Sequence, residues 1–190
     1  MTTPEIAPLL SPLAAVQRLL EYFDNQGLII GGVAASMLGT PRLTADVDVV
    51  ILLSVSRLPE LFRVASELGL IPRITCAEQF ARRNRVVLLR HADSGIGVDV
   101  SLGLLPFEHE AVARGIVHRV GNLDLRLPTP EDLVIFKTVA HRPKDLLDIE
   151  GILKSQPELD RAHIEHWVRE FAEALEMPEL WEGIAPLLKR

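Results

Sequence analysis

The chain has 190 residues, of which 48% are hydrophobic, and its 20 basic and 26 acidic side chains give a formal charge of −6. This length suits one domain, or one domain with a small helical appendage, and the acidic balance argues against a general nucleic-acid coat protein. A single cysteine, Cys76, excludes an internal disulfide framework. The first residues lack the pattern of a signal peptide, and no apolar run approaches the ~20 residues of a membrane helix, so we expect a soluble, cytoplasmic protein.

Apolar spacing predicts alternating helices and strands in the first part of the chain. The expected elements are, in chain order, a helix over 12–24, a buried strand over 28–30, a helix over 33–38, a central strand over 47–53, a helix over 58–69 and a strand over 71–75. The run over 47–53 is β-branched and apolar, which favours a strand in the middle of a sheet.

Two hairpins are expected next, because turn residues at 92–95 and at 121–122 each separate two apolar runs. From Pro128 onward the pattern becomes helical. Helices are expected over 130–140, 143–154, 160–175 and 178–188.

These patterns predict an α/β (α+β) fold. A small mixed β-sheet flanked by helices is expected over 1–127, and a helical C-terminal segment packed on that core is expected over 128–190. The stretch 127–130, with the sequence Leu-Pro-Thr-Pro, is the best candidate for a linker. A continuous core across this stretch is equally compatible with the sequence.

Three aspartates interrupt the apolar strands. Asp46 and Asp48 are two residues apart, so in a strand they project from the same face. Two carboxylates this close suit a hard divalent cation such as Mg²⁺, which takes one or two carboxylates together with phosphate oxygens and water. Asp99, between Val98 and Val100, is the expected third carboxylate on a neighbouring strand.

A pair of glycines, Gly31-Gly32, lies between the strand over 28–30 and the helix that follows it. Such a junction lets a phosphate approach the backbone closely and meet the N–H groups at the start of the helix. The glycines precede Asp46 by one helix and one loop. We therefore expect phosphates on one side of a cleft and a metal on the other.

The order of these motifs resembles the DNA polymerase β-type nucleotidyltransferase superfamily, whose signature is a strand ending in two small residues followed by paired acids on the next strand. Here the matching segments are IIGGVAASML and TADVDVVI, with the third acid at Asp99. The later segment LPTPEDLVIFKTVAHRPKDLLDIEGIL is similar to the region after the core in minimal nucleotidyltransferases and type IV toxin–antitoxin nucleotidyltransferases. The positions that correspond there are Lys137, Lys144, Asp145 and Asp148.

The resemblance implies transfer of a nucleoside monophosphate from a nucleoside triphosphate, such as ATP, with two Mg²⁺ or Mn²⁺ ions. Asp46 and Asp48 are expected to bind both ions, and Asp99 the ion nearer the acceptor. The expected nucleotide-binding residues are Gly31, Gly32, Arg42, Thr44, Lys137, Lys144 and Asp145. Lys137 is the best candidate for contact with phosphate, and Arg142 is a secondary one.

Three acceptors stay open: RNA or tRNA, a partner protein as in a toxin–antitoxin pair, or a small hydroxylated molecule. The basic run Arg82, Arg83 and Arg85 favours RNA if it contacts phosphates. A nucleotide-binding regulatory module without catalysis is the alternative from a different class. His163 and His166 are expected to lie on a solvent-exposed helix face.

Overall fold

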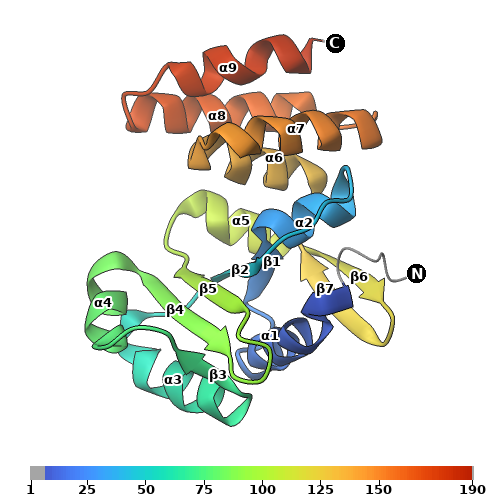
Figure 1. Ribbon diagram of the computed structural model, residues 1–190. Helices are drawn as coiled ribbons and strands as arrows, with labels where there is room; N and C mark the ends of the chain where they lie inside the picture. The colour runs from blue at the N-terminus through green and yellow to red at the C-terminus, as the bar shows by residue number, and fades with distance from the viewer. Residues whose placement is uncertain (1–6, 190) are drawn as a thin grey trace.

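The computed structural model describes residues 7–189 and contains a mixed five-stranded sheet with helices on both faces (Figure 1). The strand order is β1-β2-β5-β4-β3. The strands are β1 (Gly27–Ile30), β2 (Asp46–Ile51), β3 (Leu70–Pro72), β4 (Val86–His91) and β5 (Gly97–Leu102). Strands β2 and β5 are parallel, and the other neighbours are antiparallel. The expected mixed sheet is confirmed.

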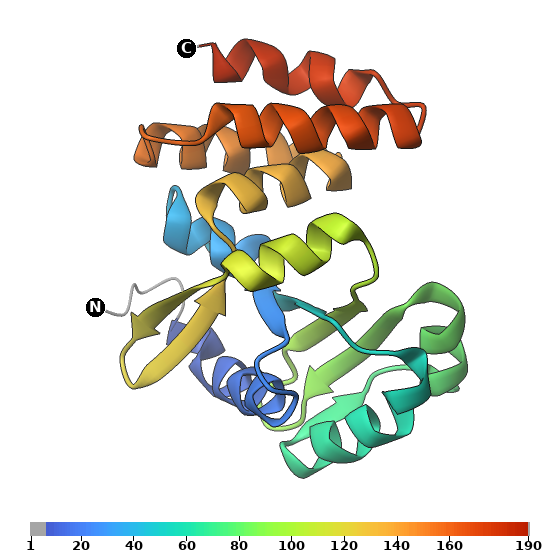
Figure 2. The ribbon, with the colours of Figure 1, turned by 180° about the vertical axis from the view of Figure 1, so that it is seen from behind.

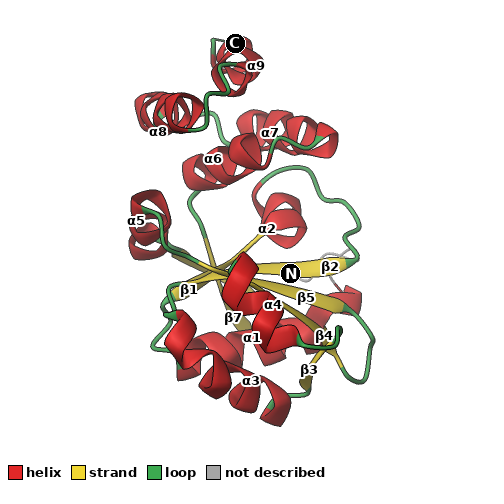
Figure 3. Cartoon of the chain, turned by 90° about the vertical axis from the view of Figure 1, so that its left-hand side faces the viewer, coloured by secondary structure: helices red, strands yellow, loops and turns green. Residues whose placement is uncertain are grey.

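Five helices cover the two faces of this sheet. They are α1 (Leu10–Tyr22), α2 (Gly31–Leu38), α3 (Leu58–Glu67), α4 (Ala77–Asn84) and α5 (Pro106–Arg114), with short 3₁₀ turns at Ala7–Leu9 and Val55–Arg57. Figure 3 shows α1, α3 and α4 on one side of the sheet and α2 and α5 on the other. Alternate residues of β2 explain this, because Val47 and Val49 are fully buried on one face while Asp46 and Asp48 point to the other.

A separate hairpin follows α5. It consists of β6 (Ile116–Val120) and β7 (Leu123–Leu127), which pair antiparallel around the turn that the sequence predicts at Gly121-Asn122. Strand β7 packs against α1 and β1. The hairpin therefore extends the core without joining the five-stranded sheet.

Four helices complete the described chain: α6 (Pro130–Ala140), α7 (Pro143–Ser155), α8 (Arg161–Ala174) and α9 (Glu179–Leu188). Thr129 caps α6, because its hydroxyl accepts a hydrogen bond from the Asp132 N–H at 3.2 Å. The helical C-terminal region that the sequence predicts is confirmed. No helix among residues 7–189 has the length and apolar character needed to cross a membrane.

The helical region and the sheet region share buried side chains. The ring of Phe107 in α5 lies 4.9 Å from Phe136 in α6 and 5.4 Å from Trp167 in α8, measured between centroids. Figure 2 shows α5 between the sheet and α6. One continuous cluster of buried apolar residues extends through both regions. The helical region therefore packs directly on the sheet region.

Two helices, α4 and α5, were not predicted. The segment of α4 is strongly polar and contains the basic run at 82–83, so its apolar residues are too few to show a helical period. The strand expected over 71–75 is shorter and ends at Pro72, and the helix expected over 33–38 already begins at Gly31. Both shifts lie at element ends, where local signals are weakest.

Candidate active site

Asp48 and Asp99 lie side by side on the central parallel strands. They are register partners in the β2–β5 pair, and Asp46 is the partner of Gly97. Because residues two apart share a face, all three carboxylates project from the face of the sheet opposite Val47. The structure thus brings the three predicted acids to one place.

The glycines at the start of α2 lie directly against this acidic row. Gly31 has φ of +63°, and a Cβ built there would lie 1.8 Å from the Asp48 Oδ2 atom. A Cβ at Gly32 would lie 2.4 Å from the Thr44 hydroxyl oxygen. Any side chain at either position would therefore displace residues of the site. The sequence predicted close approach to a phosphate, and the contact that the structure shows is with Asp48.

Asp48 has a raised pKa. Burial is the largest cause, and the negative charge of Asp46 adds to it. Arg142, the N–H of Gly32 and Lys137 act in the opposite direction. The ionised form of Asp48 is therefore disfavoured in the protein alone, and a bound cation would relieve this cost.

Asp99 also has a raised pKa, mainly because it is partly buried, while Arg73 opposes the shift. The Arg73 Nη2 atom lies 2.8 Å from Asp99 Oδ1 and 2.9 Å from Oδ2. Arg73 follows β3, and nothing in its sequence neighbourhood marks it as a site residue. Sequence reasoning missed this contact.

Thr44 and Arg42, in the loop before β2, both lie close to Gly32. The Thr44 hydroxyl donates a hydrogen bond to Asp46 Oδ1 at 3.3 Å. The Arg42 guanidinium instead binds Asp148 of α7, with Nε 2.6 Å from Oδ1 and Nη2 2.8 Å from Oδ2. Arg42 therefore connects the loop to the helical region.

Asp148 belongs to a chain of alternating charges that we call the buried ion network: Arg42, Asp148, Lys137, Asp145 and Arg142. The Lys137 Nζ atom donates to Asp145 Oδ1 at 3.0 Å and to Asp148 Oδ2 at 2.6 Å. Only 2% of the Lys137 side chain is exposed. Arg142 Nε donates to Asp145 Oδ2 at 2.7 Å. The network joins the loop before β2 to α6 and α7.

Burial alone would raise the pKa of Asp145 and Asp148. Hydrogen bonds from Arg142 and Lys137 hold the pKa of Asp145 below its ordinary value, and those from Arg42 and Lys137 do the same for Asp148. Both carboxylates are thus ionised at neutral pH, and each of their oxygens accepts a hydrogen bond from a cationic side chain.

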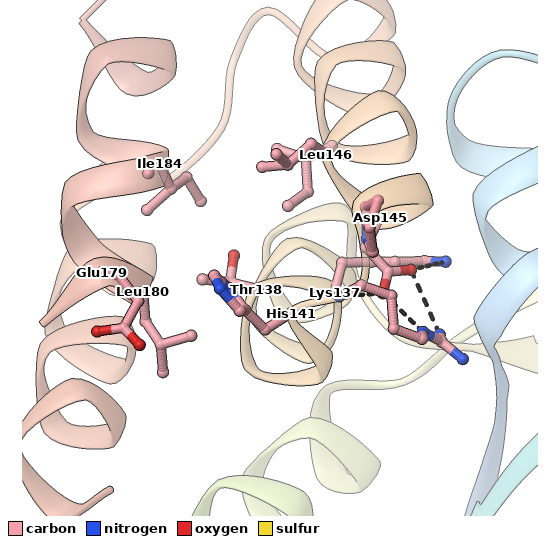
Figure 4. Close-up of a pocket in the computed structure, with 12 residues that line it drawn as sticks. Lys137, Thr138, His141, Asp145, Leu146, Glu179, Leu180 and Ile184 are labelled. Carbon is pink, nitrogen blue, oxygen red and sulfur yellow. Dashed lines mark hydrogen bonds and ion pairs between the residues drawn. The ribbon is translucent and has the colours of Figure 1, made fainter. Parts of the chain in front are cut away.

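A cavity of about 430 Å³ connects this network to the acidic row. Gly31 and Asp48 line it from the sheet region, and Lys137 and Arg142 line it from the helices. A second cavity, of about 290 Å³, lies on the other side of the network between α6, α7 and α9. Figure 4 shows Lys137 and Asp145 at its wall, with Leu180 of α9 across from them.

Several predicted residues lie elsewhere. Lys144 is exposed and lines neither of these cavities. Arg82 pairs with Glu78 at 2.6 Å, and Arg85 donates to the backbone oxygens of Leu102 and Gly103 at the end of β5. These two arginines are thus engaged within the fold.

His163 corrects another expectation. Its side chain is 10% exposed, and its Nε2 atom lies 2.7 Å from Oδ1 of the fully buried Asp132. The predicted solvent-exposed face is therefore wrong for His163. The periodicity of α8 did not reveal the contact because Asp132 belongs to another helix.

Comparison with known proteins identifies the fold. No family model and no curated protein matches this sequence. The structure is similar to that of an antigenic nucleotidyltransferase-like protein from Paracoccidioides brasiliensis, with a TM-score of 0.56 and 16% identity over 100% of this chain and 94% of that chain. At this identity the similarity shows the fold, which is nucleotidyltransferase-like.

A second similar structure is that of the antibiotic-resistance factor ANT(2'')-Ia. The TM-score is 0.58 and the identity 16%, over 94% of this chain and 97% of that chain. The conformational dynamics of ANT(2'')-Ia are regulated by its substrate. Both structures span nearly the whole of this chain, so the shared fold includes the helical region.

The geometry of Asp46 and Asp48 fits a divalent cation. They share a face of the sheet. Burial and the charge of Asp46 raise the pKa of Asp48, and a cation bound between the two carboxylates would offset this electrostatic cost. Asp99 is different, because Arg73 already contacts both of its oxygens. Among residues 7–189, no group of three or more Asp, Glu, His or Cys side chains is arranged to hold a metal ion.

Proposed function

We propose that the protein is a nucleotidyltransferase that moves a nucleoside monophosphate from a nucleoside triphosphate to an acceptor hydroxyl. The observation that supports this most strongly is the row of Asp46, Asp48 and Asp99 on one face of a nucleotidyltransferase-like sheet, with Gly31 directly against Asp48. A raised pKa at Asp48 and Asp99 is typical of carboxylates in functional sites.

In the proposed reaction, the acceptor oxygen forms a bond to the α-phosphorus as the bond between that phosphorus and the bridging oxygen of the β-phosphate breaks. Pyrophosphate leaves with the electron pair of the broken bond, and the acceptor hydroxyl passes its proton to solvent water. Asp46 and Asp48 would hold Mg²⁺ or Mn²⁺, which would supply positive charge to stabilise the phosphate oxygens.

The residues of this chain position the triphosphate. Gly31 and Gly32 open α2, whose N-terminal N–H groups face the β- and γ-phosphates in this proposal. Lys137 is committed to two carboxylates, so we assign it to anchoring the network. Arg142 lines the cavity beside Asp48 and 47% of its side chain is exposed, so it is the cation that meets a phosphate.

RNA, a partner protein of toxin–antitoxin type and a small hydroxylated molecule are the candidate acceptors. The arginines at 82 and 85 give no particular support to RNA, because both are engaged within the fold. The fold shared with an antibiotic-resistance factor makes small hydroxylated molecules the first acceptors to test.

Ligand binding tests the proposal before the acceptor is known. A nucleoside triphosphate with Mg²⁺ at a hundredfold excess over Kd should stabilise the fold by about 2.7 kcal/mol in chemical denaturation. Asp46→Asn and Asp48→Asn should lose the Mg²⁺-dependent part of this shift, and Lys144→Met is the control that keeps it. An equal shift in Asp48→Asn and in the wild type would contradict the assignment.

Transfer is measured in a second step with a nucleoside triphosphate labelled at the α-phosphate. Separate reactions contain total RNA, cell protein extract or small hydroxylated compounds. Label on one of these classes, absent with Asp48→Asn, identifies the acceptor. Triphosphate binding with no label in any reaction would favour the regulatory module without catalysis.

A further inference from the structure

Arg73 directly follows β3, the edge strand of the sheet, and its side chain contacts Asp99 on β5. Its backbone N–H donates to Leu88 of β4 at 3.1 Å, and Leu88 is the register partner of Asp99 on β5. The side chain then extends across β4 to Asp99, where Nη2 lies within 2.9 Å of both carboxylate oxygens. The Nη2 atom donates a hydrogen bond to Oδ2, whereas its contact with the buried Oδ1 is an ion pair without a hydrogen bond. The nitrogen thus takes the position of a cation that a carboxylate binds through both oxygens.

Gly97 makes this position available. A Cβ built on Gly97 would lie 2.8 Å from the Arg73 Nη1 atom, which is closer than real Cβ contacts. The nearest other atoms to that Cβ are Asp46 Cβ at 3.8 Å and Arg73 Cζ at 4.0 Å. The guanidinium therefore lies over a glycine that is also the register partner of Asp46.

The charges of the acidic row fall into two units. Asp46 and Asp48 form one, and neither carboxylate has an ion pair among residues 7–189. Asp99 and Arg73 form the other, joined by the ion pair between Arg73 Nη2 and Asp99 Oδ1 at 2.8 Å. Within the part of the chain that the structure describes, the first unit therefore lacks a paired cation and the second has one.

We propose that Arg73 supplies a fixed positive charge at Asp99, where the second ion of a two-ion site would bind, so that this chain uses one exchangeable divalent ion, at Asp46 and Asp48. The inference rests on the proposed function and replaces the expectation of two ions. Arginine suits this role because it stays protonated at every accessible pH and carries five N–H donors. The donors that do not contact Asp99 can hold the acceptor oxygen or an α-phosphate oxygen.

The number of bound ions tests this inference independently of activity. Mn²⁺ is titrated into the wild type with an α,β-methylene triphosphate analogue, and bound and free Mn²⁺ are separated by electron paramagnetic resonance. The wild type should bind one Mn²⁺ per chain. Arg73→Ala frees Asp99 and should bind two, and the second should disappear in the double variant with Asp99→Asn.

Two further variants keep the test specific. Gly97→Ala retains Arg73 but denies its guanidinium the space beside Asp99, so it should also bind a second Mn²⁺. Arg90→Ala removes an exposed arginine whose β4 position pairs with Gly97, and it should still bind one. Circular dichroism establishes that each variant is folded.

The outcomes separate the inference from the proposed function. Two Mn²⁺ ions in the wild type, or one in both Arg73→Ala and Gly97→Ala, would overturn the role of Arg73 and leave the proposed function standing. Binding of no Mn²⁺ by the wild type with the triphosphate analogue would overturn the proposed function itself, and the inference with it.

Discussion

Replacing Lys137 by methionine should destabilise the protein strongly, although no apolar contact is lost. Lys137 is 2% exposed and donates to both Asp145 and Asp148. Removing one partner from a buried ion pair costs about 3–5 kcal/mol, because the remaining charge is left without compensation. Asp145 keeps Arg142 and Asp148 keeps Arg42, so we expect the lower end of this range, about 3 kcal/mol.

Urea denaturation followed by circular dichroism measures this loss directly. For a chain of this size, about 3 kcal/mol corresponds to a fall in Tm of about 6–12 °C. The control is Lys144→Met, which removes the same charge from an exposed position of α7 and should change the free energy of unfolding by less than about 0.5 kcal/mol. A loss below about 1 kcal/mol for Lys137→Met would show that the network contributes little.

The effect of Lys137→Met should also depend on pH. The pKa values of Asp145 and Asp148 are lowered in the folded state, so their ionised forms stabilise the fold above the unfolded-state pKa, which is near 4. That stabilisation is lost as the pH falls through the lowered folded-state values. The difference between wild type and variant should therefore be constant above the unfolded-state pKa of about 4 and shrink as the pH falls below it. A difference that stays constant even below that pH would refute the electrostatic explanation.

Three further changes test other parts of the site. Asp48→Asn should raise the Tm of the metal-free protein at pH 7, because the raised pKa makes ionised Asp48 unfavourable, and the gain should vanish in melts below pH 4. Gly95→Ala, at positive φ but in open space, should lower the free energy of unfolding by about 1–3 kcal/mol through backbone strain alone. Gly31→Ala should lower it further in the same urea denaturation, because its Cβ also meets Asp48. Arg85→Ala should lower stability by about 1 kcal/mol and leave triphosphate binding unchanged, as measured by calorimetry, because its hydrogen bonds end on backbone oxygens of the core.

The acidic row could be predicted from the sequence because it depends on local periodicity. The two-residue spacing of Asp46 and Asp48 fixes a common face in any strand, and the apolar residues around Asp99 mark a second strand. The strand–glycine–helix junction is equally local. These features therefore predicted both the fold class and the residues that the structure brings together.

The partners of these residues could not be predicted in the same way. Arg42 and Asp148 are separated by 106 positions, and Arg73 and Asp99 by 26, so no local pattern joins either pair. The sequence marked Lys137 as a candidate for phosphate contact, and in the structure it is buried and contacts Asp145 and Asp148 of α7. Such contacts arise from the packing of separate elements, which residue spacing does not encode.

Nucleotidyl transfer itself is tested most directly by comparing triphosphates that carry the label at different phosphates. The identified acceptor class is incubated with enzyme, Mg²⁺ and a triphosphate labelled either at the α-phosphate or at the γ-phosphate. Attack at the α-phosphorus predicts that the α-label joins the acceptor while the γ-label is recovered in pyrophosphate. Label from the γ-phosphate on the acceptor would contradict the account, as would transfer of the α-label by Asp48→Asn at the wild-type rate.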